Sequence, residues 1–173
     1  MSRIALPALL LSLMTFTASP VHAQQWQEYR PDGAAYRIEF PGSPVQNTRD
    51  VATNIGTIHM QTSSVDVGGK TYMMICSEYP PTVTINPEKS LDGARNGSVR
   101  RTGGVLRSES RTTVGQAPAR HLIIDMPQTN QSADALMILD GRELLQAIYV
   151  GPHGTEETPE ARRFLASFES VQQ

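Results

Sequence analysis

The sequence has few of the local signatures from which an activity is usually recognised. It holds one cysteine, so no internal disulfide can form, and its four histidines lack the spacing of a metal site. It has no G-x-S-x-G nucleophile elbow, and no glycine-rich loop leads into a helix, as a phosphate-cradling loop does. The sequence therefore predicts no catalytic residue, no metal site and no cofactor.

Charge and aromatic content are also low. Seventeen acidic and 15 basic residues give a net charge of −2, and aromatic residues make up 6% of the chain. This balance is too mild, and the aromatic side chains too few among the basic ones, to indicate a nucleic-acid partner. Of the 15 basic residues, 13 are arginine, the side chain best suited to pair with a carboxylate or a phosphate.

The start of the chain has the pattern of a signal peptide. Arg3 supplies a positive charge, Ile4 to Ala18 is apolar, and Val21-His22-Ala23 has the small-residue spacing of a cleavage site. The competing interpretation is an uncleaved anchor. It is disfavoured because the apolar stretch is shorter than the roughly 20 residues that a membrane span needs, and Pro7 interrupts it.

We therefore expect residues 1–23 to be cleaved and residues 24–173 to fold as a single α+β domain. The product is expected to be soluble, periplasmic or secreted, with no membrane span in the mature chain. About 150 residues are enough to bury roughly 70% of the surface that the unfolded chain exposes.

A central hairpin is predicted between residues 133 and 150. Two apolar runs, Ala135 to Leu139 and Leu144 to Val150, flank Asp140-Gly141, a pair typical of a type I′ turn. Both runs are almost continuously apolar, which indicates a sheet covered on both faces. The alternative is a helix beginning at Asp140, because Asp140 and Glu143 have the spacing of a capping box.

Other segments show strand or helix patterns. Strands are expected at Trp26–Arg30, Tyr36–Phe40, Gly56–Val67, Lys70–Tyr79, Val105–Val114 and Arg120–Met126. The Gly56–Val67 and Lys70–Tyr79 strands should form a hairpin about Gly68-Gly69. Part-way along Gly56–Val67 the apolar residues change from one face of the strand to the other, which predicts a bulge near Thr62 to Ser64. Residues 46–54 are expected to form a polar connection.

Two helices are expected. Asn86-Pro87 has the pattern of a helix start, and the helix should end before Gly103; Gly93 and Gly97 within it indicate close packing or fraying. A final helix begins near Thr158, and an apolar stripe runs along it: Ala161, Phe164, Leu165, Phe168 and Val171. The predicted fold class is α+β, an antiparallel sheet of about 6–8 strands flanked by helices in an α/β/α sandwich.

This chain resembles an exported bacterial member, of unknown function, of the Mog1/PsbP-like superfamily. The resemblance is carried by four stretches: Tyr36 to Gly42, Leu91 to Arg95, Tyr149 to Pro152, and Phe164 to Phe168. It implies an α/β/α sandwich and a non-enzymatic role as an assembly or accessory subunit. None of these stretches carries a functional residue of the superfamily.

One charged segment stands out. Five arginines lie within 17 residues with Glu109 as the only acid among them, a local charge of +4: Arg95, Arg100, Arg101, Arg107 and Arg111. If the helix and the following edge strand pack side by side, these guanidinium groups could form a binding site for a carboxylate or a phosphate. The competing interpretation is a solvated basic face.

The sequence thus favours a soluble exported protein that binds without chemistry. Its partner would be an unknown envelope protein or an anionic envelope ligand, recognised by the arginine-rich helix and edge strand. The alternative is a small exported hydrolase with a carboxylate- or histidine-based site in a crevice between sheet and helix. His121, on the same side of its strand as Asp125, is the histidine to examine first, whereas Cys76 in an apolar run is expected to be a core residue.

Overall fold

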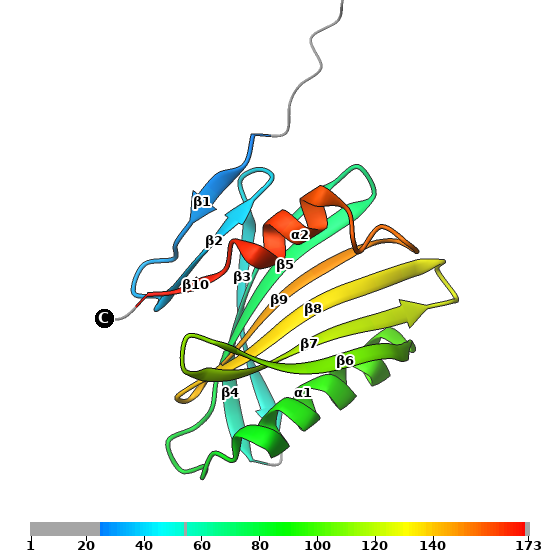
Figure 1. Ribbon diagram of the computed structural model, residues 1–173. Helices are drawn as coiled ribbons and strands as arrows, with labels where there is room; N and C mark the ends of the chain where they lie inside the picture. The colour runs from blue at the N-terminus through cyan, green and yellow to red at the C-terminus, as the bar shows by residue number, and fades with distance from the viewer. Residues whose placement is uncertain (1–24, 54, 172–173) are drawn as a thin grey trace, which may run out of the picture.

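Seven strands form one antiparallel sheet in the computed structural model, which describes residues 25–53 and 55–171. The strand order is β3-β4-β5-β9-β8-β7-β6 (Figure 1). The strands are β3 (Val45–Thr53), β4 (Gly56–Val67), β5 (Lys70–Glu78), β6 (Val105–Val114), β7 (Ala117–Met126), β8 (Gln131–Asp140) and β9 (Glu143–Pro152). The predicted signal peptide, residues 1–23, lies outside the described residues.

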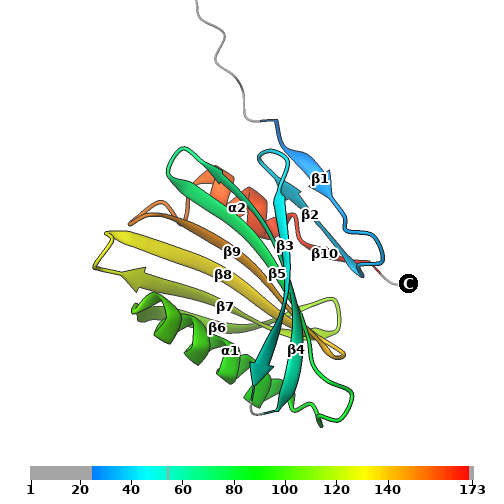
Figure 2. The same cartoon turned by 180° about the vertical axis from the view of Figure 1, so that it is seen from behind.

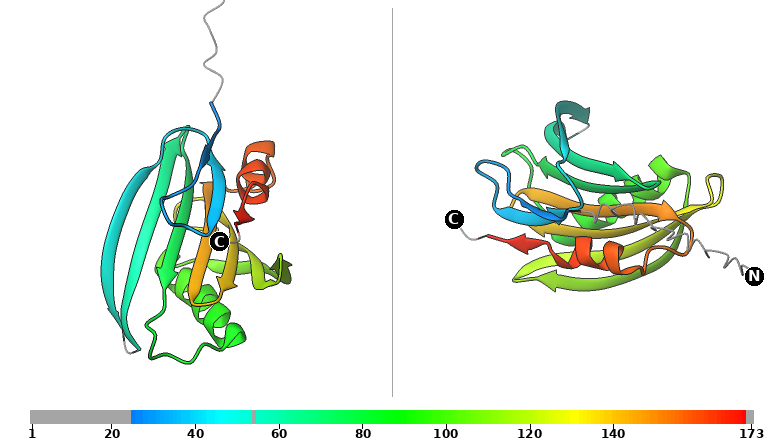
Figure 3. Two further views of the ribbon diagram at one scale, coloured as in Figure 1. Left: turned by 90° about the vertical axis from the view of Figure 1, so that its left-hand side faces the viewer. Right: turned by 90° about the horizontal axis from the view of Figure 1, so that it is seen from above.

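A small sheet and two helices complete the fold. The small sheet has the order β1-β2-β10, and its strands are β1 (Gln27–Tyr29), β2 (Tyr36–Phe40) and β10 (Glu169–Ser170). The helices are α1 (Pro87–Thr102) and α2 (Pro159–Ala166). Helix α1 covers one face of the large sheet, and α2 with the small sheet covers the other; Figures 1 and 2 show α1 in the lower part of the view and α2 in the upper part. Figure 3 shows how the long strands β3 and β4 curve at the margin of the sheet. The predicted α+β architecture is confirmed.

Each face of the large sheet carries its own apolar cluster. In β9, Leu145 and Tyr149 pack with α2 and β2, whereas Leu144 and Ile148 pack with Leu91 of α1. Successive residues of a strand point to opposite faces, so a strand covered on both sides must be apolar at nearly every position. This confirms two-face burial as the reason for the continuous apolar runs.

The turn of the central hairpin lies one residue later than predicted. Asp140 pairs with Glu143, so Gly141 and Arg142 form the turn. Gly141 has φ 55°, and Arg142 is not among the residues with positive φ. Positive φ at the first turn residue alone is the pattern of a type II′ turn, not the expected type I′. The pairing of β8 with β9 also rules out a helix beginning at Asp140.

Two predictions about the first half of the chain were wrong. Residues 46–53 of the expected polar connection instead belong to a strand, since Val45–Thr53 forms β3 and pairs with β4 throughout; residue 54 lies outside the described residues. No bulge occurs near Thr62, because β4 pairs in continuous register with both of its neighbours. The apolar residues of β4 change faces because the strand is covered on both sides: Met60 packs in the cluster below α1, and Val65 in the cluster below α2.

The final helix is shorter than its apolar stripe. It ends at Ala166, and Glu169 and Ser170 then pair with β2. Phe168 still lies in the core, where its ring stacks on Tyr36 with 6.0 Å between the ring centroids. After Ala166 the backbone N–H and C=O groups pair with the open edge of β2 instead of continuing the helix. An extended chain therefore places Phe168 in the core.

Helix α1 begins and ends as predicted but has little apolar surface. The side chain of Asn86 accepts a hydrogen bond from the backbone N–H of Lys89, and Gly103 at the other end has φ 61°. Only Leu91 and Ser98 are buried within α1. A helix with so few buried apolar side chains needs another source of attachment, because propensity alone does not stabilise it.

A buried arginine of β7 supplies that attachment. Arg120 is only 2% exposed and forms ion pairs with Glu88 and Asp92 of α1, at 2.9 and 2.5 Å, and with Glu109 of β6 at 2.5 Å. Because a buried charge needs partners, these carboxylates and the guanidinium depend on one another. Helix α1 is therefore fastened over β7 and β8 by these ion pairs together with the apolar contacts of Leu91, Ala94 and Val99.

Replacing Arg120 should destabilise the fold. We expect Arg120→Ala to lower the free energy of unfolding by about 3 kcal/mol, because it removes the buried partner of three carboxylates; two of them are about half exposed, which limits the loss. Denaturant titration measures the change. Arg111→Ala is the matched control: that side chain is 75% exposed, and its loss should cost less than about 0.5 kcal/mol. Equal effects for the two variants would contradict the role given to Arg120.

Candidate functional site

The structure does not bring the five predicted arginines together. A β-bulge between Leu106 and Ser108 shifts the register of β6 against β7. Arg107 lies in this bulge and faces the α2 side of the sheet, where its guanidinium donates to Asp125, with Nε 2.9 Å from Oδ2, and pairs with Glu156. One predicted binding residue is thus separated from the other four by the sheet itself.

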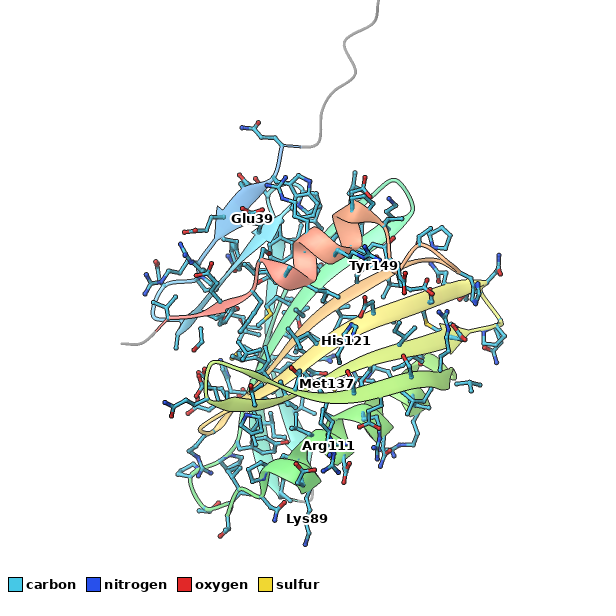
Figure 4. All side chains as sticks on the ribbon, in the orientation of Figure 1. Glu39, Lys89, Arg111, His121, Met137 and Tyr149 are labelled. Atoms are coloured by element: carbon cyan, nitrogen blue, oxygen red, sulfur yellow. The ribbon has the colours of Figure 1, made fainter. Side chains whose placement is uncertain are left out.

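Two more of the five have their charge matched locally. Arg95 pairs with Glu109 at 2.8 Å and with Asp92 at 3.2 Å. Arg111, which Figure 4 labels close to α1, pairs with Glu88 at 3.2 Å. Both therefore join the charge network around Arg120 and are not available as unpaired cations.

Arg100 and Arg101 remain. Both are exposed in the last turn of α1, and within residues 25–53 and 55–171 neither guanidinium has an ion pair or a hydrogen bond. Cations are favoured at a helix C-terminus, so their position is compatible with a stable helix. These two side chains are the part of the predicted set that can meet an external anion.

A groove of about 400 Å³ lies beside them, between α1 and the strands β3, β4, β5 and β9. Arg100 and Arg101 line its exposed rim. Figure 2 shows the tips of β3 and β4 beside α1 on this side of the molecule. The walls are mostly apolar and include Val51, Ile55, Ile58, Met60, Tyr79 and Leu144.

The groove exists because α1 has two glycines on the side that faces it. Gly93 and Gly97 line it, and a Cβ atom built on either glycine would meet nothing within 4 Å. The sequence interpretation of these two glycines as a sign of close packing or fraying is therefore wrong: the helix is continuous here, and its glycine side faces open space. Two glycines one turn apart, followed by two adjacent arginines, were a signal in the sequence that could have indicated a groove.

Two polar side chains lie in this apolar setting. Ser77 and Gln146 line the groove, and each is only 5% exposed. The Oγ atom of Ser77 is buried and has no hydrogen-bond partner in the described part of the chain. Leaving such a group unpaired costs about 1–3 kcal/mol, so a ligand that pairs with it would recover part of that cost.

A second hollow of about 490 Å³ lies between the sheet and α2. His121 and the buried Asp134 line it together with Leu136 and Leu165, and His121 Nε2 lies 2.5 Å from Asp134 Oδ1. This hydrogen bond raises the pKa of His121. Figure 4 shows His121 on the sheet between the two helices. His121 shares its side of β7 with Asp125, as expected, but its partner is Asp134.

Other reactive groups offer less. Cys76 is half-buried, and burial raises the pKa of its thiol to about 12, so it is protonated at neutral pH. Within the described ranges no three His, Cys, Asp or Glu side chains are grouped to hold a metal ion. None of the described helices is long and apolar enough to cross a bilayer.

Comparison with known proteins places the fold but no activity. No family model matches the sequence, and no curated protein matches it. The chain is similar to the solution structure of the cyanobacterial PsbP protein (CyanoP) from Synechocystis sp. PCC 6803, with a TM-score of 0.57 and 11% sequence identity. The match covers 90% of this chain and 98% of that one. At this identity it shows a shared fold, and the PsbP-like fold expected from the sequence is confirmed.

The structure also gives Arg107 a role in stability. Its partner Glu156 is buried and accepts hydrogen bonds from Ser132 Oγ at 2.7 Å and from the backbone N–H of Gly154 at 2.9 Å. Burial alone would raise the pKa of Glu156, but the hydrogen bonds from Ser132 and Arg107 outweigh it and hold the pKa at about 2. Glu156 thus ties the segment before α2 to β6 and β8.

Stability should therefore depend on Glu156 in acid. A carboxyl group with a lowered folded pKa stabilises the protein fully above its unfolded pKa, and that contribution is lost as the pH falls from about 5 towards 2. We expect Glu156→Gln to be less stable than the parent at pH 7 and to lose less stability on acidification. Urea unfolding at a series of pH values measures both. The exposed neighbour variant Glu157→Gln should keep the parental slope, and a parental slope in Glu156→Gln would contradict the assignment.

Proposed function

We propose that this protein is an exported, non-enzymatic binding or accessory protein that recognises an anionic ligand or an acidic partner. The recognition surface is the rim and groove beside α1, with Arg100 and Arg101 as the charged contacts. The observation that carries the proposal is that these two exposed guanidinium groups are unpaired and border a groove with a buried, unpaired hydroxyl.

The charge of the surface supports an anion over other ligands. Among the described residues no Asp or Glu lines the groove, so no carboxylate there competes with an external anion. The other arginines of the segment, Arg95, Arg107 and Arg111, already have carboxylate partners. A planar guanidinium donates several hydrogen bonds in a geometry that matches carboxylate and phosphate oxygens. Two adjacent guanidinium groups without internal partners favour such a group and repel a cation.

Binding without chemistry is favoured over catalysis. The resemblance to the Mog1/PsbP-like superfamily implies an accessory role, the fold shared with CyanoP agrees with that resemblance, and the thiol of Cys76 is protonated. The second candidate is a hydrolase whose base is His121. One observation favours it: the hydrogen bond between His121 and Asp134 lies in an apolar hollow between sheet and helix. No hydroxyl group in the described chain hydrogen-bonds to this imidazole, so the hollow lacks an evident nucleophile.

Export is part of the proposal and is tested separately. The pattern of residues 1–23 supports cleavage after Ala23 and delivery to the periplasm or the medium. Cell fractionation with N-terminal sequencing of the recovered protein should find Gln24 as its first residue. Recovery of full-length protein in the cytosol would contradict this part of the proposal.

Binding of acidic probes should depend on Arg100 and Arg101. We expect at least one probe among phosphatidylglycerol vesicles, polyglutamate and N-dodecanoylglycine to raise the melting temperature of the parent; a ligand at 100 times its Kd stabilises by about 2.7 kcal/mol. The Arg100→Gln/Arg101→Gln variant should lose this effect because both unpaired cations are gone.

The control has the same net charge. Arg30→Gln/Arg162→Gln removes two exposed arginines outside the groove and should keep the parental response. The proposal fails if no probe stabilises the parent or if the groove variant responds as the parent does. Turnover of ester, phosphate or glycoside substrates that disappears in His121→Ala would favour the hydrolase instead.

A further inference from the structure

We infer that the groove beside α1 binds an amphipathic acid, one in which a single apolar chain is joined to the acidic group through an ester or amide. This inference rests on the proposed function and names the class of ligand for the same site. Each part of the ligand is assigned from a different part of the groove.

The apolar chain is assigned from the walls. Ile58 and Met60 of β4 and Leu144 of β9 line the groove, and the glycine side of α1 leaves space opposite them. A volume of about 400 Å³ lies at the lower end of the range of small-molecule sites, which is about 300–1,000 Å³. Met60 adds a flexible side chain that adapts to a chain of variable shape. A purely polar anion would leave these apolar walls in contact with water.

The acidic group is assigned from the rim. Arg100 and Arg101 are the charged residues that line the groove, and both are exposed. An acid held there keeps its charge in contact with water while its chain is buried, which avoids the large cost of burying an unpaired charge. A neutral apolar ligand would fill the groove but leave both guanidinium groups without a partner.

The linking group is assigned from Ser77 and Gln146. Ser77 on β5 lies opposite Leu144 on β9, and Gln146 is the next β9 residue on the same face, so the two polar side chains are diagonal neighbours. Such neighbours have Cα atoms about 7–8 Å apart, a span that one ester or amide group can bridge. A hydroxyl donates to a carbonyl, and a side-chain amide both donates and accepts. The ligand's ester or amide would pair with the side-chain amide of Gln146 and with the buried hydroxyl of Ser77, which otherwise has no hydrogen-bond partner among the described residues.

This ligand differs from an acidic protein partner in how much of the groove it uses. An acidic segment of another protein would contact Arg100 and Arg101 at the rim without filling the space beside Gly97. A free amphipathic acid also differs from a membrane, where headgroups contact the rim and the chains stay in the bilayer. Filling the groove therefore distinguishes the three occupants.

The test compares ligands that differ by one part, with calorimetric titration of the full mature chain. N-dodecanoylglycine has all three parts, N-acetylglycine lacks the chain, and dodecanoate lacks the amide. We expect N-dodecanoylglycine, used below its micelle concentration, to bind at least tenfold more tightly than N-acetylglycine and about threefold more tightly than dodecanoate.

Two variants test the assigned contacts. Gly97→Leu places a side chain in the groove and should weaken N-dodecanoylglycine at least tenfold, while Gly97→Ala, the control, keeps most of the affinity. Ser77→Ala should weaken N-dodecanoylglycine two- to tenfold, the effect of one hydrogen bond, and leave dodecanoate unchanged. The Ser77 comparison keeps the inference testable if Gly97→Leu does not fold.

The outcomes separate the inference from the function on which it rests. Equal affinity for N-acetylglycine and N-dodecanoylglycine, or equal affinity in Gly97→Leu, would overturn the amphipathic ligand but leave anion recognition at Arg100 and Arg101 intact. Binding to phosphatidylglycerol vesicles without binding to monomeric N-dodecanoylglycine would overturn it in favour of a membrane surface. Loss of every acidic probe would overturn both.

Discussion

The position of α1 depends on the buried guanidinium of Arg120. Helix α1 has only Leu91 and Ser98 buried, so apolar contact alone holds it weakly, whereas Arg120 gathers two carboxylates of the helix and one of β6 around a single charge. The buried guanidinium would be costly to leave without these partners. The contact draws α1 over β7 and β8 and determines which side of the helix faces open space.

The candidate site follows from that position. With α1 fastened on the side of Asp92 and Arg95, the side with Gly93 and Gly97 faces a gap above β4, β5 and β9. The network around Arg120 also includes Arg95 and Arg111, which form ion pairs with its carboxylates. The β6 bulge places Arg107 on the other face of the sheet. A locally basic segment is thereby reduced to two unpaired cations at the rim of a groove.

Much of the fold could be predicted from local pattern. The two hairpins, the capped helix α1 and the two-face burial of β8 and β9 were predicted because turn glycines, capping residues and continuous apolar runs act over a few residues. Errors occurred where distant contacts decide. β3 is a polar strand that pairs along its full length with β4, and the stripe towards Val171 leaves the helix at Ala166 because β2 offers an open edge.

The sequence by itself determined the α+β class, the PsbP-like resemblance and the high density of arginines between residues 95 and 111. Only the tertiary structure decided which of those arginines are free. Arg107, for example, pairs with Asp125 and Glu156, which lie 18 and 49 positions away in the sequence. The bulge that separates Arg107 from the other arginines has no clear local signal. Charge is read from composition, but pairing depends on which residues the folded sheet places side by side.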